Sequence, residues 1–117
     1  MITRPKNRYL LVESSAPLNT ADRILADQIM AAVAFELGAI GYVKANPKIV
    51  HQAGDRSFII RVNRGHEDAL VLALSFVKKI GDARVGLYTI RTSGTIRAMI
   101  SYLKRADAKY GVFVVEK

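Results

Sequence analysis

A short segment near the C-terminus, Ser93-Gly94-Thr95-Ile96-Arg97, combines hydroxyl groups, a glycine and a guanidinium at the start of a predicted helix. Ser93 can cap that helix, and Gly94 lets the backbone approach a partner closely. Arg97 adds a fixed positive charge where the free N–H groups of a helix start already attract anions. The segment could therefore hold a phosphate, although a capped helix with Arg97 in solvent is the commoner arrangement, which the local sequence alone favours.

The chain is strongly basic, with 18 Lys and Arg against 10 Asp and Glu and a formal net charge of +8. Such a balance in a globular domain favours nucleic acid as the partner, or less often an anionic membrane surface. Half of the residues are apolar, so 117 residues are enough for one domain with its own core. Because the basic residues are dispersed along the chain, folding must assemble any positive surface.

Several kinds of chemistry are excluded by what the sequence lacks. There is no cysteine, so disulfides, thiol nucleophiles and zinc sites with cysteine ligands are ruled out. His51 and His66 lie on different predicted elements, and no phosphate-binding loop, metalloprotease motif or convincing acid–base pair is present. We expect a polypeptide without catalytic or metal-binding residues. We also expect a cytoplasmic protein without a membrane partner, since we find neither a bilayer-spanning stretch nor a signal peptide.

Hydrophobic periodicity predicts the elements that must position these residues. The strands are predicted at 8–13, 48–51 (with a start as early as 43), 56–63 and 83–91, with a further edge strand at 112–115. The helices are predicted from 19 or 20 to the glycines at 38 and 41, from 65 to 81, and from 95 to 105. We expect residues 1–7 to be a flexible basic segment and residues 8–117 to form a single domain.

The order strand, helix, strand, strand, helix, strand is the split β-α-β arrangement. It predicts an α+β, ferredoxin-like or RNA-recognition-like sandwich: an antiparallel sheet with two helices on one face, plus a C-terminal helix. Strand alternation assigns the following residues to the helix-covered core: Leu10, Val12, Phe58, Ile60 and Val62. The opposite face, with Tyr9, Leu11, Ile59 and Arg61, is mixed, and either the stripe Ile96–Leu103 or a partner protein should cover it.

The third strand bears on how such a domain would contact RNA. RNA-recognition domains stack bases on aromatic residues of the central strands. Residues 56–63 lack their glycine-and-aromatic pattern, and Phe58 falls on the core face, which leaves Tyr9 as the only candidate for stacking. Base stacking is therefore disfavoured, and contact of Arg and Lys with the phosphate backbone remains.

Taken together, several segments resemble the small basic protein subunit of archaeal and eukaryotic ribonuclease P, called component 2 in archaea and the smaller processing-of-precursor subunit in eukaryotes. The resemblance covers about residues 8–105. The matching segments are Arg8-Tyr9-Leu10, Gly38 with Gly41, Ile60-Arg61-Val62-Asn63-Arg64, Ala69 to Leu74, and Ser93-Gly94-Thr95-Ile96-Arg97. The last of these matches the family's Ser-Gly-Thr-Ile-basic motif after the fourth strand.

The resemblance implies a protein of an archaeal-type ribonucleoprotein, an endonuclease that removes the 5′ leader from precursor tRNA and whose RNA is the catalyst. Its implied partners are the ribonuclease P RNA, precursor tRNA indirectly, and a larger barrel-shaped protein subunit, and it allows a homodimer within a heterotetramer. No cofactor is expected on the protein, and magnesium is expected on the RNA. We expect RNA contacts at Arg8, Arg61, Arg64, Ser93, Gly94, Thr95 and Arg97. Arg61 or Arg64 could instead face the protein partner.

Two other functions remain open at this point. Acylphosphatases share the strand–helix order and place an Arg and an Asn around a phosphate loop, as Arg61 and Asn63 superficially suggest. Their glycine-rich loop after the first strand is missing, because residues 13–17 read Glu-Ser-Ser-Ala-Pro. The other alternative is a pure protein-assembly module in which the positive charge is incidental.

Overall fold

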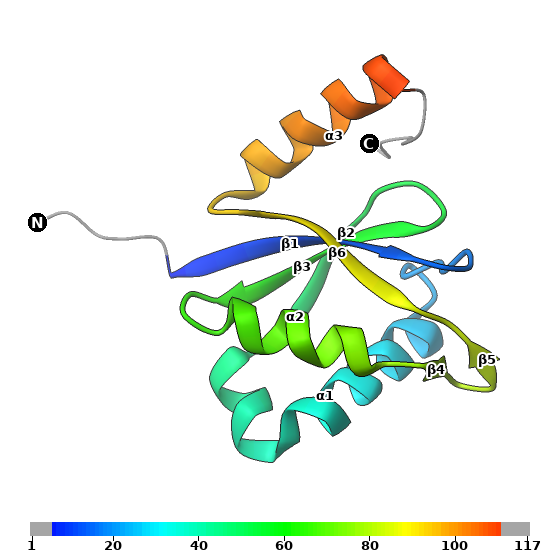
Figure 1. Ribbon diagram of the computed structural model, residues 1–117, viewed down its shortest axis with the longest axis vertical. Helices are drawn as coiled ribbons and strands as arrows, with labels where there is room; N and C mark the ends of the chain where they lie inside the picture. The colour runs from blue at the N-terminus through cyan, green and yellow to red at the C-terminus, as the bar shows by residue number, and fades with distance from the viewer. Residues whose placement is uncertain (1–5, 111–117) are drawn as a thin grey trace, which may run out of the picture.

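The computed structural model describes residues 6–110, in which a four-stranded antiparallel sheet in the order β2-β3-β1-β6 lies between two helices on one face and a third on the other (Figure 1). The sheet strands are β1 (Asn7–Ser14), β2 (Lys48–Gln52), β3 (Ser57–Asn63) and β6 (Leu87–Ser93). The helices are α1 (Arg23–Ala45), α2 (Glu67–Phe76) and α3 (Ile96–Tyr110). The predicted ferredoxin-like sandwich is confirmed. The predicted strand at 112–115 and residues 1–5 of the segment 1–7 expected to be flexible lie outside the described residues, whereas Asn7 of that segment already belongs to β1.

The main core lies between the sheet and helices α1 and α2. It contains every strand residue assigned to it from the alternation, each with no exposed surface: Leu10, Val12, Phe58, Ile60 and Val62. Helix α1 contributes Ile29 and Val33, and α2 contributes Leu70 and Leu74, all fully buried. Burying a large aliphatic side chain stabilises the fold by about 1.5–3 kcal/mol, so this layer fixes how the two helices lie on the sheet.

A second, smaller core fills the opposite face of the sheet, which α3 covers. Leu11 and Ile59 of the sheet pack with Met99 and Leu103 of α3, and all four side chains are fully buried. The chain therefore covers this part of the sheet with its own helix, which is one of the two possibilities that the sequence left open. Ile100, which the helical spacing placed in the same stripe, is only partly buried and lies outside this cluster.

Helix α1 begins later and ends later than the sequence indicated. Asp22 caps it, because its Oδ1 accepts from the backbone N–H groups of Ile24 at 3.0 Å and Leu25 at 3.4 Å. Gly38, with φ 76° and ψ 167°, breaks the helical geometry at the predicted stop, and a further helical segment continues to Ala45. The helix ends before Asn46, which adopts the left-handed conformation at φ 45°, a C-terminal role that Asn tolerates well. Residue 43, a possible strand start in the sequence, is helical.

Helix α2 ends at Phe76, earlier than the predicted stop at Gly81. The residues between form a small hairpin from β4 (Lys79–Ile80) and β5 (Ala83–Arg84). Gly81 lies in its turn with φ 60°, a conformation that glycine adopts without steric cost. The predicted strand 83–91 is therefore two strands, β5 and β6, and the sheet strand starts only at Leu87.

The composition of helix α1 bears on the expectation that no stretch of the chain is long and apolar enough to span a bilayer. Within residues 6–110 this helix alone is long and apolar enough to cross a membrane by length and composition, with 23 residues and a hydropathy of 1.5. This is weak support for a membrane span, because the core helix of a soluble protein passes the same test. Its buried residues Ile29 and Val33 pack in the main core, whereas Phe35 is 83% exposed.

Candidate nucleic-acid interface

The register of the sheet brings the predicted site residues to one end of the molecule. Strand β1 begins where β3 and β6 end, so Tyr9 lies opposite both Arg61 and Ser93. Arg64 follows β3, and its N–H donates to the carbonyl of Lys6 at 2.8 Å, just before β1. Arg97 lies in the first turn of α3, which begins at the same place (Figure 1). We call this region, with all seven predicted residues, the basic end of the sheet.

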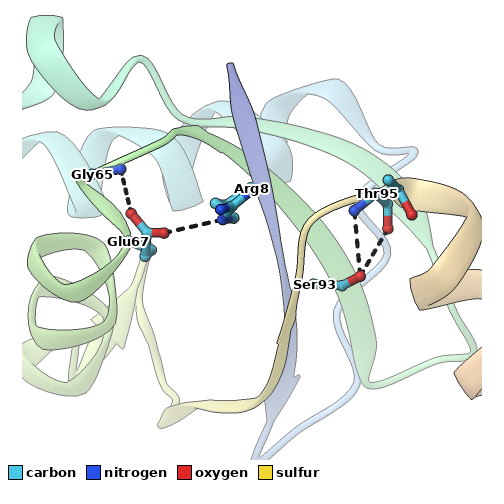
Figure 2. A network of polar contacts seen from close by, with 5 residues as sticks. All are labelled: Arg8, Gly65, Glu67, Ser93 and Thr95. Carbon is cyan, nitrogen blue, oxygen red and sulfur yellow. Dashed lines mark hydrogen bonds and ion pairs between the residues drawn. The ribbon is translucent and has the colours of Figure 1, made fainter. Parts of the chain in front are cut away.

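The turn between β6 and α3 is organised by two hydroxyl groups (Figure 2). The Ser93 Oγ accepts from the Thr95 N–H at 3.4 Å and donates to the Thr95 carbonyl at 3.1 Å. Thr95 Oγ1 accepts from the N–H of Ala98 at 3.1 Å, which is the contact of a helix N-cap. The predicted cap, Ser93, is therefore wrong: Ser93 is still paired with Tyr9 in the sheet, and Thr95 caps the helix.

Gly94 lies against the guanidinium of Arg8. A Cβ at position 94 would lie 3.3 Å from Arg8 Nη1, closer than nearly all real Cβ contacts. Arg8 Nε in turn pairs with Glu67 Oε2 at 3.4 Å, and Glu67 Oε1 accepts from the Gly65 N–H at 2.5 Å (Figure 2). Arg8 thus joins the start of α2 to the turn before α3. Arg8, one of the predicted RNA contacts, therefore has a structural role in holding these two segments together.

The predicted arginines differ in solvent exposure and in whether a carboxylate balances their charge. The Arg8 side chain is 29% exposed and its charge is partly balanced by Glu67. Arg61 is half-buried, whereas Arg64 and Arg97 are exposed. Among the described residues none of these last three forms an ion pair with a carboxylate. They are therefore the better candidates for contact with an anionic ligand.

Three lysines join the basic end without having been singled out in the sequence. Lys48 of β2 lies opposite Arg61 in the sheet. The carbonyl of Lys44, at the end of α1, accepts from Asn63 Nδ2 at 2.9 Å, and that of Lys6 accepts from Arg64. All three lysines are exposed. Strand register would have found Lys48, whereas Lys44 and Lys6 are placed by contacts of Asn63 and Arg64 that local patterns do not show.

The geometry gives no support to an acylphosphatase-type site. Asn63 uses its amide to hold the end of α1 through Lys44. At the end of β1 and directly after it, the N–H of Ser14 donates to the Arg56 carbonyl at 2.7 Å and that of Ser15 to the Gly86 carbonyl at 2.9 Å. These amides are thus engaged in backbone bonds and are not free to cradle a phosphate. Among the described residues no cluster of His, Asp and Glu could hold a metal ion.

The fold and this end of the sheet define a basic ferredoxin-like domain. A sequence model of the Rpp14/Pop5 family matches residues 8–104. The chain therefore belongs to the Rpp14/Pop5 family, and the resemblance described from the sequence is confirmed.

Curated relatives are archaeal proteins named ribonuclease P protein component 2. The protein from Methanosphaerula palustris is 33% identical over 96 residues, and that from Methanoculleus marisnigri is 32% identical over 97 residues; each alignment covers 82% of this chain and 60% of the relative. That from Methanocorpusculum labreanum is 28% identical over 96 residues, 82% of this chain and 65% of the relative. The chain thus spans less than two thirds of these relatives' length.

A solved structure has the same fold. A chain in the cryo-EM structure of yeast ribonuclease MRP aligns with a TM-score of 0.62, over 93% of this chain and 96% of that chain. The two chains are 12% identical, so this likeness concerns the fold alone.

Proposed function

We propose that the chain is a non-catalytic protein subunit of ribonuclease P that binds and orders the catalytic RNA for removal of the 5′ leader from precursor tRNA. The observation that carries this proposal is the basic end of the sheet, where Arg61, Arg64 and Arg97 lie without a carboxylate partner among the described residues. The names of the archaeal relatives support it.

The proposed mechanism is electrostatic. Each Lys or Arg that neutralises an RNA phosphate releases counterions, which gives affinity without reading the base sequence. Arg61 and Lys48 present charge along the sheet row that continues to Tyr9 and Ser93. Arg97 presents charge at the first turn of α3, where unpaired N–H groups of the helix start add to the attraction for phosphate.

The protein in this proposal supplies no cofactor. Magnesium ions are held by the RNA, and the protein lowers the repulsion between RNA segments that the ions would otherwise have to screen. The larger ribonuclease P protein subunit is the proposed protein partner, and the cytoplasm the proposed location. A homodimer within a heterotetramer is compatible with this assignment.

A second function, a pure protein-assembly module, is favoured by one observation. The outer surfaces of α1 and α2 expose large apolar side chains: Phe35 at 83%, Val43 at 74%, Ile40 at 72%, Leu72 at 58% and Phe76 at 55%. Apolar surface of this kind is typical of protein contacts. A pull-down with partner proteins that is insensitive to nuclease, combined with no effect of the protein on RNA, would support this alternative against the first.

The test of the proposed function is reconstitution of leader removal at lowered magnesium, with the catalytic RNA, the larger protein subunit and the full chain. Arg61→Ala, Arg64→Ala and Arg97→Ala should each reduce the rate without unfolding the protein. Arg23→Ala is the matched control, because Arg23 is exposed at the start of α1 and is not among the residues predicted to contact RNA. Wild-type activity in all three variants would overturn the proposal.

A further inference from the structure

A recess lies beside the β4–β5 hairpin. This hairpin lies at the end of the sheet opposite the basic end (Figure 1). Its volume is about 450 Å³. Lys78, Arg84 and Ser75 form its polar side, the buried residues Val85 and Leu87 its apolar side, and Tyr88 a wall. Small-molecule sites of proteins commonly have volumes of about 300–1,000 Å³, so the recess is large enough for one.

The small hairpin gathers the positive charges of this recess. The N–H of Val85 donates to the carbonyl of Lys78 at 3.0 Å, and Lys79 lies opposite Arg84. No carboxylate lines the recess, and within residues 6–110 neither Lys78 nor Arg84 forms an ion pair. The recess therefore attracts anions, and its apolar side suits a group with a flat hydrophobic face.

Tyr88 has the placement of a stacking platform. It lies on the edge strand β6 and is 56% exposed. It lines the recess and also a smaller hollow, which contains Arg56 and the carboxylates of Glu13 and Asp55. Its hydroxyl lies over Gly86, where a Cβ would come within 2.5 Å of it. An aromatic ring bordering two open hollows can stack on a base, as in single-strand binding proteins.

The backbone beneath the ring is held in place before any ligand arrives. Ser15 donates its N–H to the Gly86 carbonyl at 2.9 Å, and its Oγ accepts from the Gly86 N–H at 2.9 Å. Arg56 Nη1 donates to the Ser15 carbonyl at 3.1 Å. The position of the wall is thus fixed by contacts from three segments of the chain, which reduces the ordering cost of binding.

We propose that this recess binds one unpaired nucleotide of single-stranded RNA, with the base stacked on Tyr88 and the phosphate held by Lys78 and Arg84. The combination of an exposed aromatic ring with two cations and no carboxylate in the recess favours a nucleotide over a peptide segment. The site lies apart from the basic end and is formed by different residues. It adds an RNA contact to the proposed function and can be tested without the catalytic RNA.

The test is fluorescence anisotropy of a labelled single-stranded oligouridylate titrated with the full chain. Tyr88→Ala should weaken binding roughly 5- to 150-fold, the range expected for one base–aromatic stack. Tyr88→Phe should bind like the wild type, since the ring is retained. An abasic oligonucleotide of equal length should abolish the difference between wild type and Tyr88→Ala. Equal binding by wild type and Tyr88→Ala, or loss of binding in Tyr88→Phe, would overturn the proposal.

Two further variants address the phosphate and the folding of the test proteins. Lys78→Ala and Arg84→Ala should each make the slope of log affinity against log salt less negative by about 0.7, the value per phosphate for single strands. Gly86→Ala should also weaken binding, because it displaces the ring without removing it. Unchanged slopes in both charge variants, or displacement of the oligonucleotide by an acidic peptide, would count against a nucleotide site.

The controls separate this site from the basic end. Ile90→Ala lies on the same strand, is 42% exposed in the native protein and does not line the recess, so it should bind like the wild type. Arg97→Ala should leave the Tyr88-dependent affinity unchanged even where it slows leader removal. If Tyr88→Ala binds the oligonucleotide like the wild type while Arg61→Ala and Arg97→Ala still slow leader removal, this proposal is overturned and the proposed function is not.

Discussion

Gly94 and Arg8 approach so closely that a methyl group at position 94 would lie 3.3 Å from the Arg8 Nη1 atom. Arg8 is in turn paired through its Nε with Glu67 at 3.4 Å, so a shift of its guanidinium would disturb that ion pair. The turn that opens α3 is therefore positioned against an arginine of the first strand, which is itself held by the second helix.

Gly94→Ala should lower the free energy of unfolding by about 0.5–1.5 kcal/mol, because the added methyl group displaces the guanidinium from Glu67. In an Arg8→Ala background the same substitution should cost much less, since the obstructing group is gone. A double-mutant cycle in urea measures the coupling between the two positions. Additive effects would mean that the close approach has no energetic consequence.

Thr95→Ala should destabilise the protein by about 1 kcal/mol, because it removes the N-cap that accepts from Ala98. Thr95→Ser should restore most of this stability, and Ser93→Ala should cost less than Thr95→Ala. Thermal unfolding of the three variants ranks them. A larger loss in Ser93→Ala would assign the cap to Ser93 after all.

Leu103→Ala should cost about 2–5 kcal/mol, because the side chain is fully buried between α3 and the sheet. Ile100→Ala should cost clearly less, since Ile100 is only partly buried. Equilibrium denaturation in urea compares the two. Equal losses would mean that α3 faces the sheet with a different side from the one described.

Glu67→Gln tests the electrostatic balance of the basic end. The amide keeps an acceptor for the Gly65 N–H but removes the negative charge beside Arg8. The stability should fall by at most about 1 kcal/mol, because both partners are partly exposed to solvent. RNA affinity should rise, measured by filter binding at fixed salt. A fall in affinity in a stably folded variant would show that the ion pair itself is needed for binding.

Strand alternation was sufficient to predict β1 and β3 and which of their side chains lie on each face of the sheet. Val62 and Leu11 fall on opposite sides as expected, because side-chain direction in a strand depends on the local period alone. Helix ends were predicted less well. Gly38, predicted as a stop, does leave helical geometry at φ 76° and ψ 167°, but a further helical segment, which the sequence did not indicate, follows it to Ala45.

The candidate site was predicted in its parts but not in its assembly. The sequence indicated Arg8, Arg61 and the Ser93 segment separately, and only the strand register places them at one end. The contact of Gly94 with Arg8 joins residues far apart in the chain, so local patterns carry no trace of it. Tyr88 escaped notice for the same reason, because the recess exists only after the hairpin folds.

The most direct test of the central claim is the salt dependence of binding to the catalytic RNA. Log affinity falls linearly with log salt, and a variant carrying Arg61→Ala, Arg64→Ala and Arg97→Ala should make this dependence shallower. The slope should become less negative by roughly 2–3, at about 0.9 for each phosphate that the protein no longer neutralises. Arg23→Ala should leave the slope unchanged. A triple variant with the slope and affinity of the wild-type protein would contradict the conclusion that this end of the sheet binds RNA.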